Sequence, residues 1–331
     1  MIKNTQPDGS VRPKGSAGSQ RPVFIVLSRH SFDYAALCFQ SLVANSLDPL
    51  SITLLVDDEE DKTIFATLME ETDLGFNSAR ILTKKELDGA AELRLSEYPS
   101  ILGLREGHPC WRKITDPLLL SADGEEVIVL DPDLYFPNKF HFEVAPERGV
   151  FLMHQKPNCL FPPRAVRRAF EKGYQLARHV DIGVAQYCVG GFDIKWLDTF
   201  LKEMAPADFN RFMHIEAIVW SAIAIKFGGL YLDRSVWRCW QKGYFKRLAL
   251  VFGVHGVHLL RLEQLSTVKC IHISGQSKWW ALEAKKRGVL IATNNTIAFP
   301  TQGKEYVELS KARYEYEQFY KALVPARLKA T

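Results

Sequence analysis

The chain has 331 residues, of which 47% are hydrophobic and 24% charged, and its formal net charge is +4. These are ordinary values for a globular protein of one large or two modest domains, and the charge is too small to indicate nucleic-acid binding. No apolar run reaches the roughly 18 residues of a membrane-spanning helix. The 6 cysteines are scattered without a C-x-x-C pair, which favours reduced thiols in a cytoplasmic protein over disulfides or a zinc site.

The first part of the chain predicts a disordered lead followed by a parallel sheet. Residues 1–21 are rich in Gly, Ser, Pro, Lys and Arg and lack the apolar core of a signal peptide. Residues 22–27 and 51–56 are apolar runs typical of buried strands, and residues 32–45 between them have helical spacing. This βαβ pattern predicts an α/β fold in which helices flank a mostly parallel sheet. It lacks both the G-x-G-x-x-G of dinucleotide-binding folds and the G-x-x-x-x-G-K-[ST] of P-loops.

Residues 127–136, VIVLDPDLYF, form the segment around which the predicted fold is organised. The first four residues predict a strand that is buried on both faces. Asp131 and Asp133 follow directly, and in extended backbone two carboxylates at this spacing point to the same side. At the carboxyl end of a parallel strand they would offer hard oxygen ligands to a divalent cation. The alternative is a polar turn that ends the strand.

The rest of the chain alternates between helical and strand-like patterns, which continues the α/β pattern of the opening. Further strands are predicted at residues 80–82, 149–154 and 182–192, and helices at residues 62–71, 84–93, 111–121, 164–179, 194–204, 210–227 and 304–323.

Two features of the middle region each have a functional and a structural interpretation. Gly190 and Gly191 end the strand predicted at 182–192, where a glycine pair either lets a ligand approach the backbone or forms a β-bulge. Glu216 lies near the start of an apolar helix, where a carboxylate either faces a pocket or stabilises the positive end of the helix.

Residues 226–261 carry seven Lys or Arg against a single acid, Asp233, and interleave them with aromatic side chains. Such a stretch could face an anionic acceptor or an anionic membrane surface, which would make the protein peripheral at a membrane. The alternative is an irregular, partly buried insertion with a solvated rim.

A second candidate site segment is residues 268–280, VKCIHISGQSKWW. A short apolar strand ends at His272, and Gly275 and Lys278 follow at three-residue spacing. The imidazole could bind the same cation as Asp131 and Asp133. Gly275 would let the backbone approach an anion, and Lys278 would place a positive charge on a phosphate. Each residue alone is more often structural or solvated, and their combination favours a phosphate site.

The pattern H-x-x-G-x-x-K-x-W, far downstream of a strand-terminal D-x-D, resembles the glycogenin and lipopolysaccharide galactosyltransferase type of retaining glycosyltransferases. That family has the GT-A fold, a Rossmann-like fold of nucleotide-diphospho-sugar transferases. The resemblance implies that Asp131, Asp133 and His272 bind a manganese or magnesium ion. It also implies that Lys278 and the backbone at Gly275 contact the diphosphate of a nucleotide sugar, with UDP-sugars the donors favoured in the family.

Looser matches extend this resemblance over residues 22–281. On the helix before the D-x-D, Lys113 is similar to a basic residue that contacts the donor, and Ser28 follows the first strand as a further donor contact. The Gly190-Gly191 pair is similar to an N-A-G turn of the family that binds the donor.

The chain also departs from the family pattern. Val189 replaces the asparagine of the N-A-G turn, and Glu216 is only the nearest acid to an acidic-Gln pair that usually begins the next helix. Trp279 stands where a proline is usual. Because residues 274–280 include small polar residues, we expect a loop that closes over the diphosphate, with Trp279 or Trp280 excluding water.

The resemblance implies a glycosyltransferase that moves a sugar from a nucleotide-diphosphate sugar to a saccharide or other hydroxyl acceptor, with retention of configuration. No carboxylate pair has a recognisable spacing for double displacement, so we expect Asp193 and Glu216 to position the sugar. The metal ion and Lys278 would neutralise the diphosphate as it leaves. We expect the GT-A domain at residues 22–300 and a helical tail at residues 301–331.

Two other functions stay open on the sequence. A GT-A-like module could bind a nucleotide sugar without transferring it, which loss of Asp131, Asp133 or His272 would favour, and all three are present. A sugar nucleotidyltransferase has a related sheet but needs a Gly-rich, basic loop after the first strand. This chain has the sequence SRHS there, at residues 28–31.

Overall fold

The computed structural model describes residues 20–204, 212–240, 244–275, 277–293, 295–297 and 301–323. The lead predicted at residues 1–21 therefore lies outside the described residues, except for the last two. Within the described ranges, no helix has both the length and the apolar character that crossing a membrane requires.

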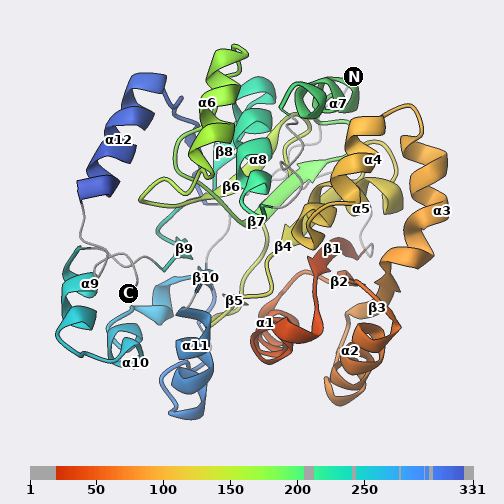
Figure 1. The fold of residues 1–331 in the computed structure, drawn as a ribbon. Coiled ribbons are helices and arrows are strands. Elements are labelled where there is room, and N and C mark those ends of the chain that lie inside the picture. Colours follow the sequence, from red (N-terminus) through yellow and green to blue (C-terminus); the bar gives the residue numbers. More distant parts are fainter. Residues whose placement is uncertain are drawn as a thin grey trace, which may run out of the picture.

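The described strands form one twisted sheet, in the order β3-β2-β1-β4-β7-β6-β9-β10-β5, and β8 pairs with β6 and with β11 (Figure 1). The strands are β1 (Arg21–Val26), β2 (Leu50–Val56), β3 (Ser78–Thr83), β4 (Glu126–Leu130), β5 (Leu134–Tyr135), β6 (Val150–His154), β7 (Val180–Cys188), β8 (Gly229–Tyr231), β9 (Trp237–Cys239), β10 (Cys270–His272) and β11 (Lys304–Glu305).

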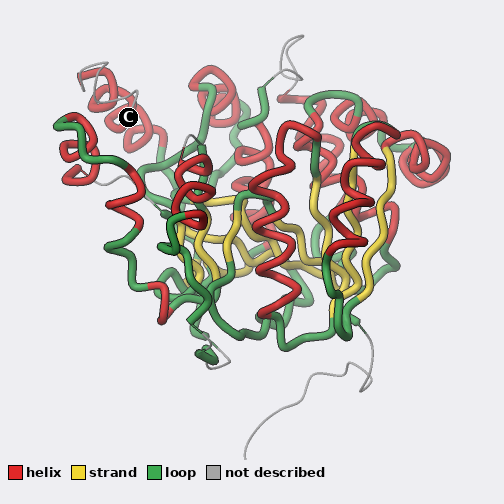
Figure 2. Tube along the Cα trace, turned by 90° about the horizontal axis from the view of Figure 1, so that it is seen from below, coloured by secondary structure: helices red, strands yellow, loops and turns green. Residues whose placement is uncertain are grey.

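Helices lie on both faces of this sheet (Figure 2). They are α1 (Phe32–Asn45), α2 (Glu59–Glu71), α3 (Lys84–Leu95), α4 (Pro99–Arg105), α5 (Arg112–Leu120), α6 (Pro163–Glu171), α7 (Ile194–Met204), α8 (Ile215–Phe227), α9 (Tyr244–Val251), α10 (Gly256–Leu260), α11 (Ser277–Lys286) and α12 (Lys311–Leu323).

Alternate residues of the central strands enter different cores because side chains point to opposite faces of a sheet. In β1, Phe24 and Val26 pack with apolar residues of α3 to α8, whereas Val23 and Ile25 pack with those of α1 and α2. A third core joins α1, α10 and α11 beside β5 and β10. This two-sided burial explains why the strands are continuous apolar runs in the sequence.

Strand direction positions the candidate site. Strands β1, β2, β3 and β4 are mutually parallel, so the segments that follow β1, β2 and β4 meet at one edge of the sheet. Strand β7 runs antiparallel to both β4 and β6. The start of β7 therefore lies at the same edge as the end of β4, and the end of β7 lies at the opposite edge.

Several predicted elements are confirmed and some are wrong. The helices predicted at 32–45 and 194–204 have these bounds in α1 and α7. The helix predicted at 164–179 ends at Glu171, because Gly173 adopts a φ of +80° that ends the helix. The helix predicted at 304–323 begins only at Lys311, and Lys304–Glu305 instead pair with β8.

Glycine is required where β6 and β8 approach, and this can be tested. Gly229 has a φ of +109°, and a Cβ there would collide with the carbonyl oxygen of Val150. We expect Gly229→Ala to lower the free energy of unfolding by at least about 2 kcal/mol. The matched control is Gly89→Ala in α3, where a Cβ meets nothing within 4 Å. That change should raise stability by about 0.5–1 kcal/mol. Urea unfolding followed by circular dichroism measures the stability of both variants. Equal effects of the two substitutions would contradict the requirement for glycine at position 229.

Candidate active site

The two aspartates of the D-P-D segment converge with His272, as predicted from the sequence. Asp131 and Asp133 lie between β4 and β5, and β10 pairs with β5 so that His272 stands opposite Leu134. The Nε2 atom of His272 is 3.0 Å from Oδ1 of Asp133 and 3.6 Å from Oδ2 of Asp131. The backbone N–H of Ile273 donates to the carbonyl of Asp133 at 3.0 Å and holds the two segments together.

The donor set of this cluster fits a divalent cation. One ligand atom from each of Asp131, Asp133 and His272 can be chosen such that all lie within 4.8 Å of one another. Oδ1 of Asp133 and Nε2 of His272 are buried and lie 3.0 Å apart, and apart from this contact neither has a hydrogen-bond partner in the described structure. The aspartate side chains are 14% and 13% exposed, so an ion can reach them. Two carboxylates and one imidazole are groups that can bind a divalent ion.

Asp181 orients the histidine and was not predicted from the sequence. Its Oδ1 lies 2.8 Å from Nδ1 of His272, and its side chain is 1% exposed. Gly183 lies against the same ring, and a Cβ there would be 2.6 Å from Nδ1 of His272. A carboxylate on Nδ1 turns Nε2 toward Asp131 and Asp133, the arrangement found around metal-binding histidines. The sequence offered one indication of this role, because Asp181 is an acid at the start of an apolar strand.

A second group of possible ligands consists of Asp181, Cys239 and His272. All three side chains are buried, so an ion would have no open path to them. We therefore interpret Asp181 and Cys239 as support for His272.

Lys113 links the cluster to Glu216 inside the protein. Its Nζ lies 2.5 Å from Oδ1 of Asp131 and 2.8 Å from Oε2 of Glu216. Burial by itself lowers the pKa of Lys113, but Asp131 and Glu216 outweigh this effect and raise it well above its ordinary value. Glu216 also accepts a hydrogen bond from the indole of Trp220 at 3.3 Å. Burial raises the pKa of Glu216 to about 7 and raises that of Asp131 as well, and the positive charge of Lys113 opposes both shifts.

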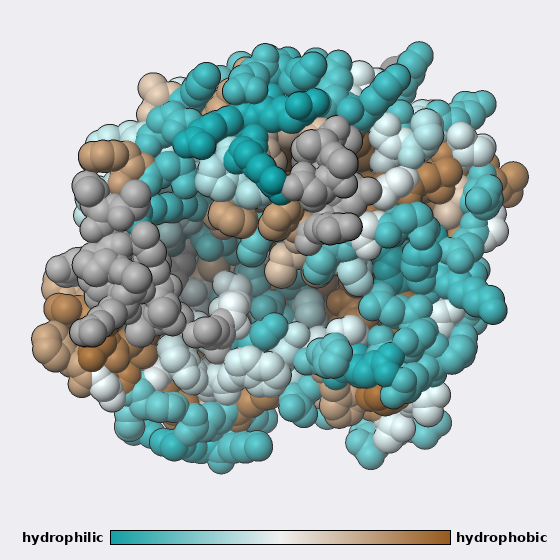
Figure 3. All heavy atoms as spheres, in the orientation of Figure 1, coloured by the Kyte–Doolittle hydropathy of each residue, from teal (hydrophilic) through white to brown (hydrophobic). Residues whose placement is uncertain are grey.

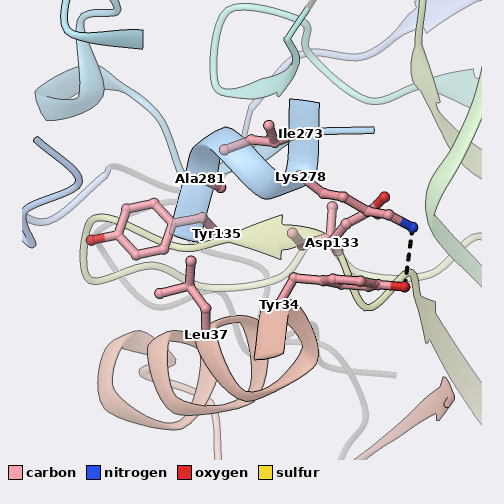
Figure 4. A pocket seen from close by; sticks show the side chains of 8 residues that line it. Tyr34, Leu37, Asp133, Tyr135, Ile273, Lys278 and Ala281 are labelled. Carbon is pink, nitrogen blue, oxygen red and sulfur yellow. Dashed lines mark hydrogen bonds between the residues drawn. The ribbon is translucent and has the colours of Figure 1, made fainter. Parts of the chain in front are cut away.

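Lys278 lies beside Asp133 in a pocket between α1 and α11 (Figure 4). Its Nζ donates to the hydroxyl of Tyr34 at 3.1 Å and sits 4.3 Å from the centre of that ring. The prediction of a loop at residues 274–280 is wrong in part, because Ser277 begins α11 and both tryptophans lie in this helix. Gly275 has a φ of +64°, which makes the turn before the helix.

The structure does not bring Gly190, Gly191 or Asp193 to the cluster, which corrects their assignment as donor-binding and catalytic residues. They follow β7, whose Cys188 pairs with Glu126 at the start of β4. From Gly183 to Cys188 at this end, the strand spans roughly 17 Å. Asp193 is exposed and accepts a hydrogen bond from the N–H of Lys195 at 2.8 Å, so it caps α7.

Ser28 follows β1 at the same edge of the sheet as Asp131, because β1 and β4 are parallel. Its backbone N–H donates to the hydroxyl of Ser31 at 3.1 Å, which closes a tight turn. The neighbouring Arg29 pairs with Asp58, Glu60 and Asp61. Arg29 is therefore neutralised by these acids and is not directed at a phosphate.

Comparison with known proteins identifies the fold of the chain. No family model and no curated protein matches the chain. Among solved structures, mouse xyloside xylosyltransferase 1 in its apo form is 11% identical, with 78% of this chain and 98% of that chain covered and a TM-score of 0.50. The predicted GT-A fold is confirmed. The galactosyltransferase LgtC, in complex with donor and acceptor sugar analogues, is 14% identical, with 81% and 95% covered and a TM-score of 0.44.

The charge on His272 makes a testable prediction for metal binding. Burial by itself lowers the pKa of His272, but Asp181 and Asp133 raise it well above its ordinary value. A raised pKa favours the doubly protonated ring, which has to release a proton from Nε2 before that atom can bind a metal ion. We expect the affinity for Mn²⁺ to rise with pH, by up to about tenfold per unit, until the raised pKa is passed.

Isothermal titration calorimetry between about pH 6 and pH 8 measures how the affinity depends on pH. Repeating the titration in buffers of different ionisation enthalpy gives the number of protons released on binding. Asp181→Asn removes a negative charge from Nδ1, so it should lower the pKa of His272 and shift the dependence to lower pH. An affinity that does not change with pH would show that His272 does not bind the ion through Nε2.

Proposed function

We propose that this protein is a metal-dependent glycosyltransferase that moves a sugar from a nucleotide-diphosphate sugar to a hydroxyl acceptor. The proposal rests on one arrangement: Asp131, Asp133 and His272 converge at the carboxyl edge of a GT-A sheet, with Lys278 lining the same pocket as Asp133. Two carboxylates and an imidazole can hold a divalent ion, and a lysine beside them can hold a diphosphate.

Asp131, Asp133 and His272 would hold the ion, manganese or magnesium. When bound, it supplies positive charge that stabilises the diphosphate as a leaving group. Lys278 adds a second positive charge from α11, and the backbone at Gly275 lets the diphosphate approach closely. Because Lys278 now rests on the ring and hydroxyl of Tyr34, it has to leave only a weak contact to reach a phosphate.

Ser28 and Lys113 would complete the donor site. Ser28 lies just beyond the carboxyl end of β1, where open α/β sheets bind their ligands. Two of the three N–H groups of Lys113 point to Asp131 and Glu216, which leaves the third for the donor. The resemblance seen in the sequence favours a UDP-sugar as donor and a saccharide as acceptor.

Retention of configuration is proposed from the same resemblance, with departure and attack on one face of the sugar. Glu216 is a poor nucleophile here because Lys113 and Trp220 bind its carboxylate and it is 1% exposed. We propose instead that Glu216 positions Lys113. With Glu216 held in this way, the leaving phosphate is the base that accepts the proton of the acceptor hydroxyl.

Two alternatives have less support. A sugar nucleotidyltransferase would bring a basic loop after the first strand onto a phosphate, but Arg29 pairs with three acids. A module that only binds nucleotide sugars would not need a complete set of metal ligands. All 6 cysteines are free in the structure, which supports a reducing compartment such as the cytoplasm.

A donor screen tests the proposal. The full chain is incubated with Mn²⁺ and individual nucleotide sugars without an acceptor, and released nucleotide diphosphate is measured, because water can take the place of the acceptor hydroxyl. We expect release from one donor class, and its loss when the metal is chelated. Metal-dependent donor binding without release would favour the binding module, and release of pyrophosphate from a nucleoside triphosphate and a sugar phosphate would favour the nucleotidyltransferase.

Asp133→Asn should abolish activity without unfolding the protein. The change removes a metal ligand but keeps the size of the side chain and the backbone hydrogen bond to Ile273. We expect turnover to fall at least about a thousandfold, with the free energy of unfolding in the absence of metal within about 1 kcal/mol of wild type. The control is Asp123→Asn, an exposed acid in the turn before β4. A large loss of stability without metal would mean that Asp133 is structural.

Lys278→Ala should lower turnover more than it weakens donor binding. The charge that Lys278 meets increases as the diphosphate departs, so its contribution is largest in the transition state. We expect single-turnover rates about 100-fold lower and a donor dissociation constant raised less than about tenfold. Lys286→Ala, at the exposed end of the same helix, is the control and should leave both unchanged. Unchanged rates for Lys278→Ala would show that α11 only covers the pocket.

A further inference from the structure

Helix α9 directs apolar side chains to solvent. Phe245 and Phe252 are 83% and 78% exposed, and Val251 is 45% exposed. Phe245, Leu248 and Phe252 recur at helical spacing and share one side, whereas Ala249 and Leu250 on the other side pack against the third core. A helix on the surface of a soluble domain normally has a polar outer side. Figure 3 shows the resulting hydrophobic area at the lower left, over α9.

The segments after α9 and α10 extend this apolar area. Leu262 is 74% exposed and Val254 is 39% exposed. Lys246 of α9 forms an ion pair with Glu263, so Leu262 lies beside α9. We refer to the exposed side chains of this region as the α9–α10 face; they are Phe245, Val251, Phe252, Val254 and Leu262. Protruding apolar groups of this extent on one surface indicate an interaction site.

The same region is rich in basic residues. Residues 244–293 contain eight Lys or Arg and only two acids. Of the eight, Lys269 is buried against Glu143 and Lys278 lies in the pocket, and neither adds charge to this face. Both acids are neutralised, Glu263 by Lys246 and Glu283 by Arg287. Exposed basic groups stand next to the apolar ones, with Arg261 before Leu262. The last turn of α11 adds Lys285 and Lys286, and His255, 3.4 Å from Glu283, links this helix to the segment after α9.

We propose that the α9–α10 face docks the protein on an anionic phospholipid surface. Aromatic and aliphatic side chains would enter the interface between headgroups and acyl chains, and Arg261, Lys285 and Lys286 would lie against the headgroup phosphates. Apolar side chains that protrude singly from a basic surface match such an interface, where both parts contribute to binding. The proposal goes beyond the transferase function and does not depend on it.

The position of α11 makes docking compatible with an open pocket. Lys278 is in the first turn of this helix and Lys285 in the last, about 10 Å apart along the axis. The pocket with Tyr34 and Asp133 lies at the first turn, and the basic end lies next to the α9–α10 face. A protein docked in this way would hold its pocket close to the bilayer without covering it.

Vesicle co-sedimentation tests the proposal. The full chain is mixed with vesicles of phosphatidylcholine alone, or with phosphatidylglycerol added. We expect binding to the anionic vesicles only, weakened by salt. Phe252→Ser combined with Leu262→Ser should weaken binding at least about tenfold, and Lys285→Glu combined with Lys286→Glu by a similar factor. The matched control is Phe76→Ser with Leu93→Ser, which changes one phenylalanine and one leucine that are 57% and 82% exposed elsewhere.

Three results would overturn the proposal. The first is that the wild type does not bind anionic vesicles. The second is that the Phe252→Ser, Leu262→Ser variant binds them as well as the wild type does. The third is that light scattering shows a wild-type dimer, which this variant converts to a monomer. The last result would assign the face to a second copy of the chain. Mn²⁺ binding by each variant is measured in parallel, because it depends on Asp131, Asp133 and His272 and should not change. Loss of vesicle binding with intact Mn²⁺ binding thus separates this proposal from the proposed function.

Discussion

The interaction on which the candidate site depends is the placement of His272 between carboxylates on both sides of its ring. Asp181 is 2.8 Å from Nδ1 and Asp133 is 3.0 Å from Nε2, so one imidazole connects β7, β10 and the segment between β4 and β5. Carboxylates so close together inside a protein repel one another unless positive charge lies between them. Asp181 and Asp133 raise the pKa of His272, which favours a positive charge on the ring, and Lys113 places a second positive charge against Asp131 and Glu216. The same balance is available to a divalent ion in exchange for a proton.

This arrangement is possible because the sheet reverses direction at β7. In an entirely parallel sheet the start of that strand would lie far from the end of β4. Because β7 is antiparallel to β4, the backbone N–H of Asp131 donates to the carbonyl of Gly183 at 2.8 Å, and Asp181 is placed behind His272. Gly183 in turn leaves room for the imidazole ring. One change of strand direction thus determines which side chains can reach the cluster.

Helix α11 joins the two proposals in space although they are independent in chemistry. Its first turn carries Lys278 into the pocket beside Asp133, and its last turn carries basic side chains next to the exposed apolar side chains of α9. Movement of α11 would therefore alter the pocket and the surface together. Tyr34 and Trp279, whose ring centres are 5.6 Å apart, hold the first turn against α1.

The sequence alone was sufficient for the α/β pattern, for helices such as α1 and α7, and for Asp131, Asp133, His272 and Lys278 as a candidate set. These depend on periodicity and on short motifs at strand ends, which are local properties of the chain. Asp181, the Lys113–Glu216 pair and the contact between Tyr34 and Lys278 appeared only in the tertiary structure. Gly190, Gly191 and Asp193 were misassigned because no local sequence pattern predicts the direction of a strand within the sheet. It is decided when a strand pairs with neighbours distant in sequence, and only that pairing determines which end of β7 faces the site.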